Sequence, residues 1–162
     1  MKTQLHKRIL SYAMTKKLFL LFAILNVSIA SAQTFTENGI NYNIIPNTTD
    51  VEVGRNQYTT ASVTIPTSVV YNTVTYAVTS IGVSSFYSNK SLTSITIPNS
   101  VTSIEKNAFY DSSNLASAAI GNSVASIGEK AFYNCKLLTA LTIPNSVTSL
   151  GFGAFAECSG LT

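Results

Sequence analysis

The side chains that could support catalysis or bind a metal are few in this chain. The single histidine, His6, precedes Gln33 and lies in a segment that we expect to be removed on export. Without it, the chain lacks the commonest general base and metal ligand. We therefore exclude Ser-His-Asp and Cys-His mechanisms, expect no metal site and no cofactor, and predict that the chain is not an enzyme.

Carboxylates offer one geometric alternative. Asp111 and Glu157 flank Asn134, which lies midway between them in the sequence. Two carboxyl groups about 5–10 Å apart can act as general acid and base. Because these residues, like Glu105 and Glu129, fall in segments with turn or helix character, solvated charge is the favoured interpretation.

Cysteine chemistry depends on how the chain coils. Cys135 and Cys158 are separated by one period of a sequence repeat, described below. If residues at this spacing lie on neighbouring strands, their Cα atoms are about 5 Å apart, which is inside disulfide range, and an oxidising compartment would permit a bond. However, such side chains point in parallel, and the corresponding upstream residue is Ser112. A free, half-buried thiol is our first interpretation, and a disulfide is the alternative.

The elements that position all these residues repeat with a fixed period. Leu92, Leu115, Leu138 and Leu161 begin successive copies of one phrase, and their sequence numbers rise in equal steps of 23. A fixed period in the range of roughly 20 to 50 is the signature of a solenoid. An irregular copy precedes them, since Ile81 and Ile104 are separated by the same step.

The residue pattern within each copy of the repeat predicts two short strands and a helical turn. Ile95 and Ile97 alternate with Ser94 and Thr96, the period-2 pattern of a strand with one apolar face. Pro98 ends this strand, residues 101–104 read as a second short strand, and residues near 108–109 favour one turn of α or 3₁₀ helix. The sequence therefore predicts a β-rich α/β repeat solenoid.

Stacked copies turn sequence columns into ladders with a spacing of roughly 4.8 Å. One column is aromatic and predicts a buried ladder; it comprises Phe86, Phe109, Phe132 and Phe155. A second column follows the first strand and predicts side-chain amides that satisfy turn backbone groups; it comprises Asn99, Asn122 and Asn145.

Two further sets of residues are candidates for a binding surface. A tyrosine column directly follows the phenylalanines: Tyr87, Tyr110 and Tyr133. It is either an amphipathic edge that packs its rings or an exposed aromatic stripe for protein or glycan contacts. The outer strand face is flat, uncharged and rich in hydroxyls, and includes Ser94, Thr96 and Thr142; simple solvation is the alternative for this face.

The N-terminus has the pattern of a signal peptide. Lys16 and Lys17 precede the apolar run 18–25, and Ala30-Ser31-Ala32 is a small-x-small cleavage site. We predict cleavage after Ala32. A conventional signal peptide could begin at Met14. In that alternative, residues 1–13 are an upstream extension that results from a misassigned start codon.

Removal of this leader changes the sign of the net charge. Five of the ten basic residues precede Gln33 and all seven acidic residues follow it, which leaves the rest of the chain at −2. No basic patch remains that would favour nucleic acid or an anionic membrane surface, and no membrane span is expected after the leader.

Residues 33–60 do not follow the period and predict an N-terminal β cap. Asn38-Gly39 lies between alternating apolar residues, which is a hairpin signal. Residues 61–162 form the repeat array, with a hairpin insert near 70–77. The array stops where a further copy begins and has no polar capping repeat, so we expect a chain truncated at its C-terminus.

The repeat phrase resembles that of BspA-type bacterial leucine-rich repeats. The similarity rests on Leu-x-x-Ile-x-Ile-Pro-Asn-Ser-Val-Thr-Ser-Ile from Leu92 onward, on the later Ala-Phe pair, and on Cys135 and Cys158. The second copy departs from it, with Ala118 for Ile95 and Gly121 for Pro98. The resemblance implies a right-handed, leucine-rich-repeat-like coil.

The resemblance also implies a secreted or cell-surface protein that adheres to host or matrix proteins, glycans or other cells. No residue-level binding motif is carried over from the family. The alternative hypothesis is a structural spacer that presents a C-terminal domain absent from this sequence.

Overall fold

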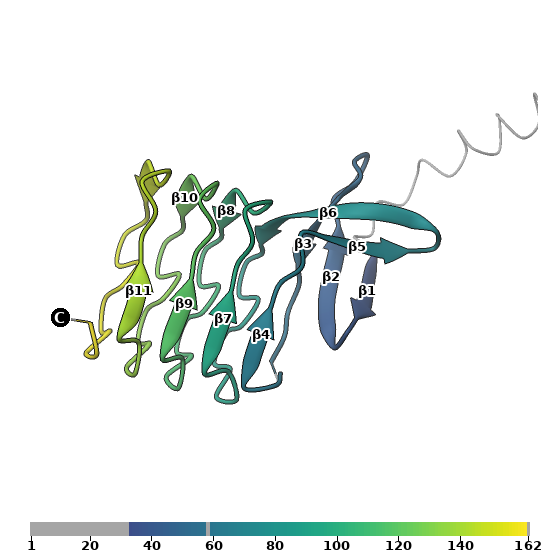
Figure 1. The fold of residues 1–162 in the computed structure, drawn as a ribbon. Helices are drawn as coiled ribbons and strands as arrows, with labels where there is room; N and C mark the ends of the chain where they lie inside the picture. The colour runs from purple at the N-terminus through teal and green to yellow at the C-terminus, as the bar shows by residue number, and fades with distance from the viewer. Residues whose placement is uncertain (1–32, 58, 162) are drawn as a thin grey trace, which may run out of the picture. The chain divides into compact units, whose positions relative to one another are not determined.

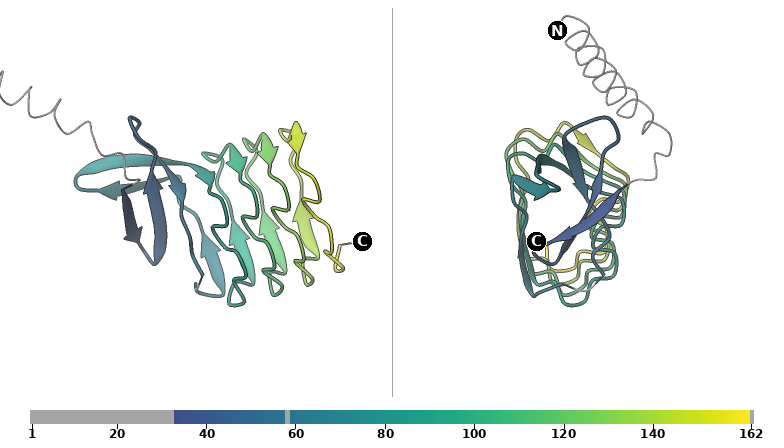
Figure 2. Two further views of the ribbon diagram at one scale, coloured as in Figure 1. Left: turned by 180° about the vertical axis from the view of Figure 1, so that it is seen from behind. Right: turned by 90° about the vertical axis from the view of Figure 1, so that its right-hand side faces the viewer.

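The repeats coil in register, so that each contributes one strand to each of two sheets. The computed structural model describes residues 33–57 and 59–161, where the chain winds into a β-solenoid with coils stacked along one axis (Figures 1 and 2). In the first sheet, Ile95 pairs with Ala118, and Ala118 with Leu141, all in parallel. The strands of this sheet are, in spatial order, β4 (Ser62–Thr64), β7 (Ser94–Thr96), β9 (Ser117–Ala119) and β11 (Ala140–Thr142). The predicted 23-residue solenoid is confirmed.

The second sheet runs from the N-terminal strands to the last coil. Its order is β1-β2-β3-β6-β8-β10-β12, and β5 pairs with β6 outside this path. The strands are β1 (Thr34–Glu37), β2 (Ile40–Ile44), β3 (Asp50–Val53), β5 (Ser68–Tyr71), β6 (Val74–Ile81), β8 (Ser103–Ile104), β10 (Ser126–Ile127) and β12 (Ser149–Leu150). The parallel pairing of β3 with β6 joins the N-terminal strands to the solenoid.

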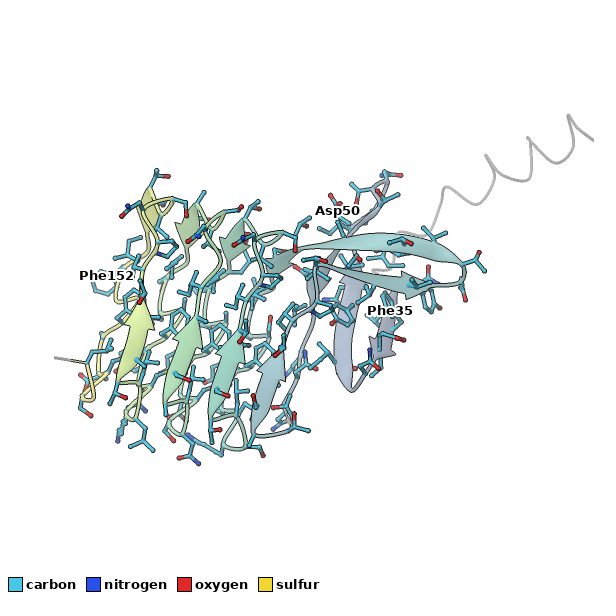
Figure 3. All side chains as sticks on the ribbon, viewed as in Figure 1. Phe35, Asp50 and Phe152 are labelled. Atoms are coloured by element: carbon cyan, nitrogen blue, oxygen red, sulfur yellow. The ribbon has the colours of Figure 1, made fainter. Side chains whose placement is uncertain are left out.

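Two antiparallel hairpins precede the regular coils. β1 and β2 are joined at Asn38 and Gly39, whose φ angles of 50° and 77° are those of a tight hairpin turn. β5 and β6 form the other hairpin, where the sequence indicates an insert. The Phe35 ring on β1 stacks on Tyr71 of β5, with ring centroids 4.4 Å apart. This contact packs one hairpin against the other; Phe35 is labelled in Figure 3.

The segment predicted as a short helical turn is not helical, and no helix occurs in the described part of the chain. In one coil, the N–H of Ala108 donates to the Glu105 carbonyl three residues earlier, whereas the N–H of Phe109 donates to Ala131 in the next coil. The same alternation recurs in neighbouring coils. A helix cannot propagate when every second N–H is used between coils, and Asn107, with φ 57°, lies outside the helical region.

The predicted phenylalanine ladder forms the centre of the core. Phe86, Phe109 and Phe132 are completely buried, and Phe155 is partly buried. Successive ring centroids are 5.1, 4.8 and 5.3 Å apart, with interplanar angles of 1°, 13° and 14°. Side chains one full repeat apart in the sequence are therefore in direct contact.

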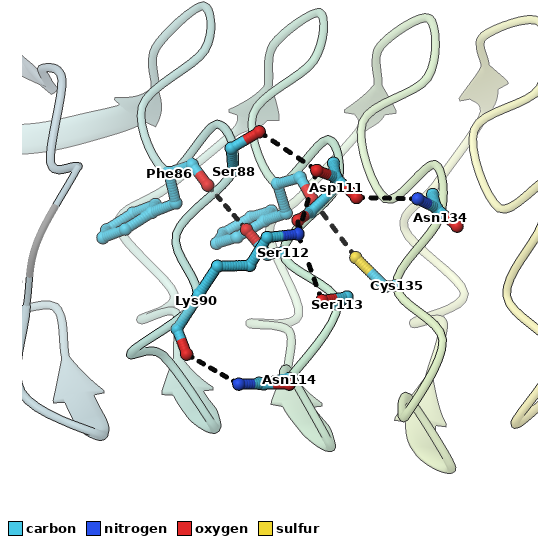
Figure 4. Close-up of polar contacts among 10 residues, drawn as sticks. Phe86, Ser88, Lys90, Asp111, Ser112, Ser113, Asn114, Asn134 and Cys135 are labelled. Carbon is cyan, nitrogen blue, oxygen red and sulfur yellow. Dashed lines mark hydrogen bonds and ion pairs between the residues drawn. The ribbon is translucent and has the colours of Figure 1, made fainter.

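A second buried ladder, which we call the donor ladder, was not predicted. In each coil a side chain donates a hydrogen bond to a backbone carbonyl of the preceding coil, and Figure 4 shows the bonds of Ser112 and Cys135. The bonds are Asn89 Nδ2 to Asn56 O (2.9 Å), Ser112 Oγ to Phe86 O (2.6 Å), Cys135 Sγ to Phe109 O (3.2 Å) and Cys158 Sγ to Phe132 O (2.9 Å). Amide, hydroxyl and thiol are interchangeable here because each is a small donor.

Burial depends on the neighbouring coil. Leu150 of the last described coil is 56% exposed, whereas its equivalents Ile104 and Ile127 are each 1% exposed. Phe152 on the same coil is 83% exposed (Figure 3), but it lies in the outward-facing column of Lys106 and Glu129, so its exposure does not bear on stacking. A single coil thus leaves its apolar side chains uncovered, and stacking supplies the burial.

We expect Phe109→Ala to lower the free energy of unfolding by about 3–5 kcal/mol, because it removes a ring packed on both faces. Phe155→Ala should cost clearly less, since one face of that ring has no neighbouring phenylalanine in the part of the chain described. Urea unfolding followed by circular dichroism measures both changes. Equal losses would contradict stacking as the source of burial.

Ser112→Ala should lower the free energy of unfolding by about 1 kcal/mol, the net value of one hydrogen bond. The Phe86 carbonyl keeps its turn bond from the Asn89 N–H, so the loss stays modest. Ser112→Cys should cost less than Ser112→Ala, because a thiol fills this place in the next coil. The same urea titration compares them, and a cysteine variant no better than alanine would argue against the donor role.

Candidate binding surfaces

The outer strand face has the shape of a shallow groove. Ser94, Thr96 and Thr142 lie on it as expected, and the hollow above the strands has a volume of about 530 Å³. The groove is lined in part by the small side chains of Ala119 and Ala140, and no charged residue lines it. The face is therefore small, polar and neutral, and it offers no side chain able to anchor a partner strongly.

The tyrosine row, Tyr87, Tyr110 and Tyr133, forms a continuous stack. Its ring centroids are 5.0 and 4.9 Å apart, with interplanar angles of 2° and 14°. All three side chains are partly buried, and among the described residues none of their hydroxyls has a hydrogen-bond partner. Because the rings face one another, the row offers partners its edges and hydroxyl groups more than its faces.

A lysine lies at the C-terminal end of the tyrosine row, next to Tyr133. Lys130 Nζ lies 5.8 Å from the centroid of the Tyr133 ring, within range of a cation–π interaction. The row thus combines the aromatic rings that are enriched in protein interfaces with a basic group.

A polar network surrounds Asp111 (Figure 4), in the column that directly follows the tyrosines in the sequence. Asp111 accepts hydrogen bonds from Ser88 Oγ at 3.2 Å and from Asn134 Nδ2 at 2.7 Å, and Lys90 Nζ lies 2.9 Å from its Oδ2. The hydrogen bond from Lys90 is the main cause that holds the pKa of the Asp111 carboxyl below its ordinary value. Asp111 therefore ties three coils together as an anion.

Two of the other carboxylates considered from the sequence, Glu129 and Glu105, have structural partners. Glu129 pairs with Lys106 at 2.8 Å, and Glu105 accepts a hydrogen bond from Ser103 at 2.7 Å. Glu157 is exposed and shares a column with Asp111, but Asn134 lies between them. No group of three or more histidine, cysteine or acidic side chains that could hold a metal occurs within the described ranges.

Cys135 and Cys158 are free thiols, and both are buried. Each belongs to the donor ladder and points its sulfur at a carbonyl oxygen of the preceding coil. The neighbouring Cys158 thiol, together with burial, raises the pKa of the Cys135 thiol. This direction favours the protonated form that donates to the Phe109 carbonyl.

The asparagine column forms one hydrogen-bonded rung. The N–H of Asn122 donates to Asn99 Oδ1 at 2.7 Å. The next rung, from Asn122 to Asn145, has no such bond among residues 33–57 and 59–161. All three side chains are exposed, so this column contributes one link at the coil edge and no continuous ladder.

The leader and its predicted cleavage site after Ala32 lie outside the described residues. In the part that is described, there is no helix long and apolar enough to cross a membrane.

Solved structures of bacterial leucine-rich repeat proteins resemble this one. A leucine-rich cell surface protein from Faecalibacterium prausnitzii is 32% identical, with a TM-score of 0.72 over 81% of this chain and 36% of that one. A protein from Bacteroides ovatus is 30% identical, with a TM-score of 0.65 over 78% of this chain and 39% of that one. A protein from Bacteroides capillosus is 28% identical, with a TM-score of 0.67 over 72% of this chain and 86% of that one.

This chain therefore spans little more than a third of the length of the first two of these relatives. No curated protein matches it. The family model described as "BspA type Leucine rich repeat region" matches residues 62–162 in six copies. Since this match covers more than half of the sequence and coincides with the stacked coils, the chain belongs to the BspA-type leucine-rich repeat family.

Proposed function

We propose that this chain is a secreted or cell-surface binding protein that mediates adhesion to host or matrix proteins or to other cells, with the tyrosine row as its contact surface. The family consists typically of non-catalytic binding proteins, and a similar protein is a cell surface protein by name. The predicted signal peptide supports export. Adhesion requires a surface that remains rigid while it binds, and the solenoid supplies one.

The stacked tyrosines are the observation that carries this proposal. Tyrosine is enriched among the residues that dominate binding energy, because it combines a large apolar ring with a hydroxyl group. Stacking fixes the rings before binding, so little side-chain freedom remains to be lost. The Asp111 network holds the neighbouring backbone in place, and Lys130 adds a basic group at one end.

The strand face supports a lesser role. Its neutral, shallow surface lacks the aromatic and arginine side chains that usually anchor partners. A uniform stack of coils with such a face would also suit a spacer, which is the alternative function. The two functions differ in whether removal of the tyrosines changes binding.

The test compares three variants for binding to a panel of immobilised matrix proteins and glycans by surface plasmon resonance. Changing Tyr87, Tyr110 and Tyr133 together to Ala should weaken binding at least thirtyfold, the effect of losing about 2 kcal/mol or more at a binding hot spot. Changing all three to Phe keeps the stack, so any loss then reports the hydroxyls alone.

The matched control changes Ser94, Thr96 and Thr142 to Ala and should bind like the unmodified chain. Circular dichroism confirms that each variant is folded. Equal binding by the alanine variant and the unmodified chain, or no binding to any partner by either, would contradict the proposal and favour the spacer.

A further inference from the structure

The outer face of the N-terminal strands carries two adjoining hollows that share Arg55 and Asn41. The first, of about 360 Å³, is bounded also by Thr34, Thr36 and Asn43. The second, of about 320 Å³, extends toward Gln57. Each is of a size that suits one small polar group or ring, and Arg55 lies between them.

Hydrogen bonds fix the floor of both hollows. Thr36 Oγ1 donates to Asn41 Oδ1 at 2.6 Å, and Asn41 Nδ2 donates to the Arg55 carbonyl at 2.8 Å. Asn43 Nδ2 donates to Glu52 Oε1 at 2.8 Å, and no carboxylate lines either hollow. The Arg55 backbone is therefore held in place, and one N–H of the Asn41 amide remains available to a ligand.

Arg55 is exposed, and neither of the two ion pairs in the described part of the chain includes it. A guanidinium group presents a planar fork of N–H donors that matches a carboxylate with two parallel hydrogen bonds. Arg55 thus provides an anion-binding group in a surface otherwise composed of hydroxyls and amides.

The lining favours a sugar over a peptide as the bearer of that carboxylate. Apart from Phe35, whose ring stacks on Tyr71 and Tyr42, the residues around both hollows are glycine or polar. Peptide side chains are usually held by apolar pockets, which this lining does not offer. Threonine hydroxyls and asparagine and glutamine amides are instead donors and acceptors for the hydroxyl groups of a sugar ring.

We propose that this face binds an acidic saccharide, with Arg55 pairing with the carboxylate and Asn41, Thr34 and Gln57 contacting ring hydroxyls. The site is distinct from the tyrosine row and does not depend on the function proposed for it. The second hollow lies toward the N-terminal end of the tyrosine row. In the donor ladder the Asn56 carbonyl accepts the bond from Asn89, as the Phe86 carbonyl accepts the bond from Ser112. Asn56 is therefore equivalent to Phe86, and Gln57, which follows it, is equivalent to Tyr87.

Isothermal titration of the chain with a tetrasaccharide of galacturonic acid tests this proposal. The methyl ester of the same tetrasaccharide is the matched ligand, because it keeps the rings and removes the charge. We expect the acid to bind at least tenfold more tightly than the ester. Arg55→Gln should weaken binding of the acid by about tenfold, as expected for losing hydrogen bonds to a charged group.

One control variant locates the effect. Lys136→Gln removes one positive charge from an exposed site on a distant coil and should not change the affinity for the acid. The proposal is overturned if Arg55→Gln binds like the unmodified chain, if acid and ester bind equally, or if the acid does not bind. Stronger Arg55-dependent binding of a tetra-aspartate peptide would assign the site to acidic peptides instead and would also overturn it.

Discussion

Contact between successive coils is the constraint on which this structure depends. Each regular coil contains strands of only two or three residues and a series of turns, too little to bury its own apolar side chains. The Phe109 ring is covered on one face by Phe86 and on the other by Phe132. Backbone N–H groups in the turns bond to the next coil in alternation with bonds inside their own coil. The same stacking thus satisfies both the apolar and the polar groups of the chain.

Stacking also determines what the surface can offer. Side chains one repeat apart become neighbours, so a single tyrosine per repeat becomes a row of parallel rings with centroids 5.0 and 4.9 Å apart. Asp111 reaches coils on both sides through Ser88 and Asn134, and it holds the backbone beside that row. A repeat too simple to form a pocket can in this way present a rigid, regular surface to a large partner.

The period predicted most of the fold, because columns read from the sequence became ladders in space. Phe109 and Tyr110 both fell in the expected ladders, although spacing alone does not say that the tyrosine rings stack face to face. The prediction of a helical turn was wrong because the helix propensity of a short segment carries no information about hydrogen bonds to the next coil. Asn107 and Asp111, residue types that tolerate positive φ, were the available signal against a helix.

Other features had weaker signals or none. In the sequence, the donor ladder is visible only as a column of small polar residues in which Ser112 precedes Cys135. That these side chains share a role as donors could be recognised only once the positions of the carbonyl acceptors were known. The parallel direction of equivalent side chains argued for free cysteines, and the structure has them free. The hollows around Arg55 lie outside the repeats, where no column exists for comparison.

Direct contact between phenylalanines of adjacent coils is the claim that most needs a test in solution. Nuclear Overhauser spectroscopy on a chain labelled only at phenylalanine reports it. We expect cross-peaks between the ring protons of Phe109 and Phe132 and between those of Phe132 and Phe155, with none between Phe109 and Phe155. Absence of the first two, or equal intensity for all three pairs, would contradict a solenoid built by stacking.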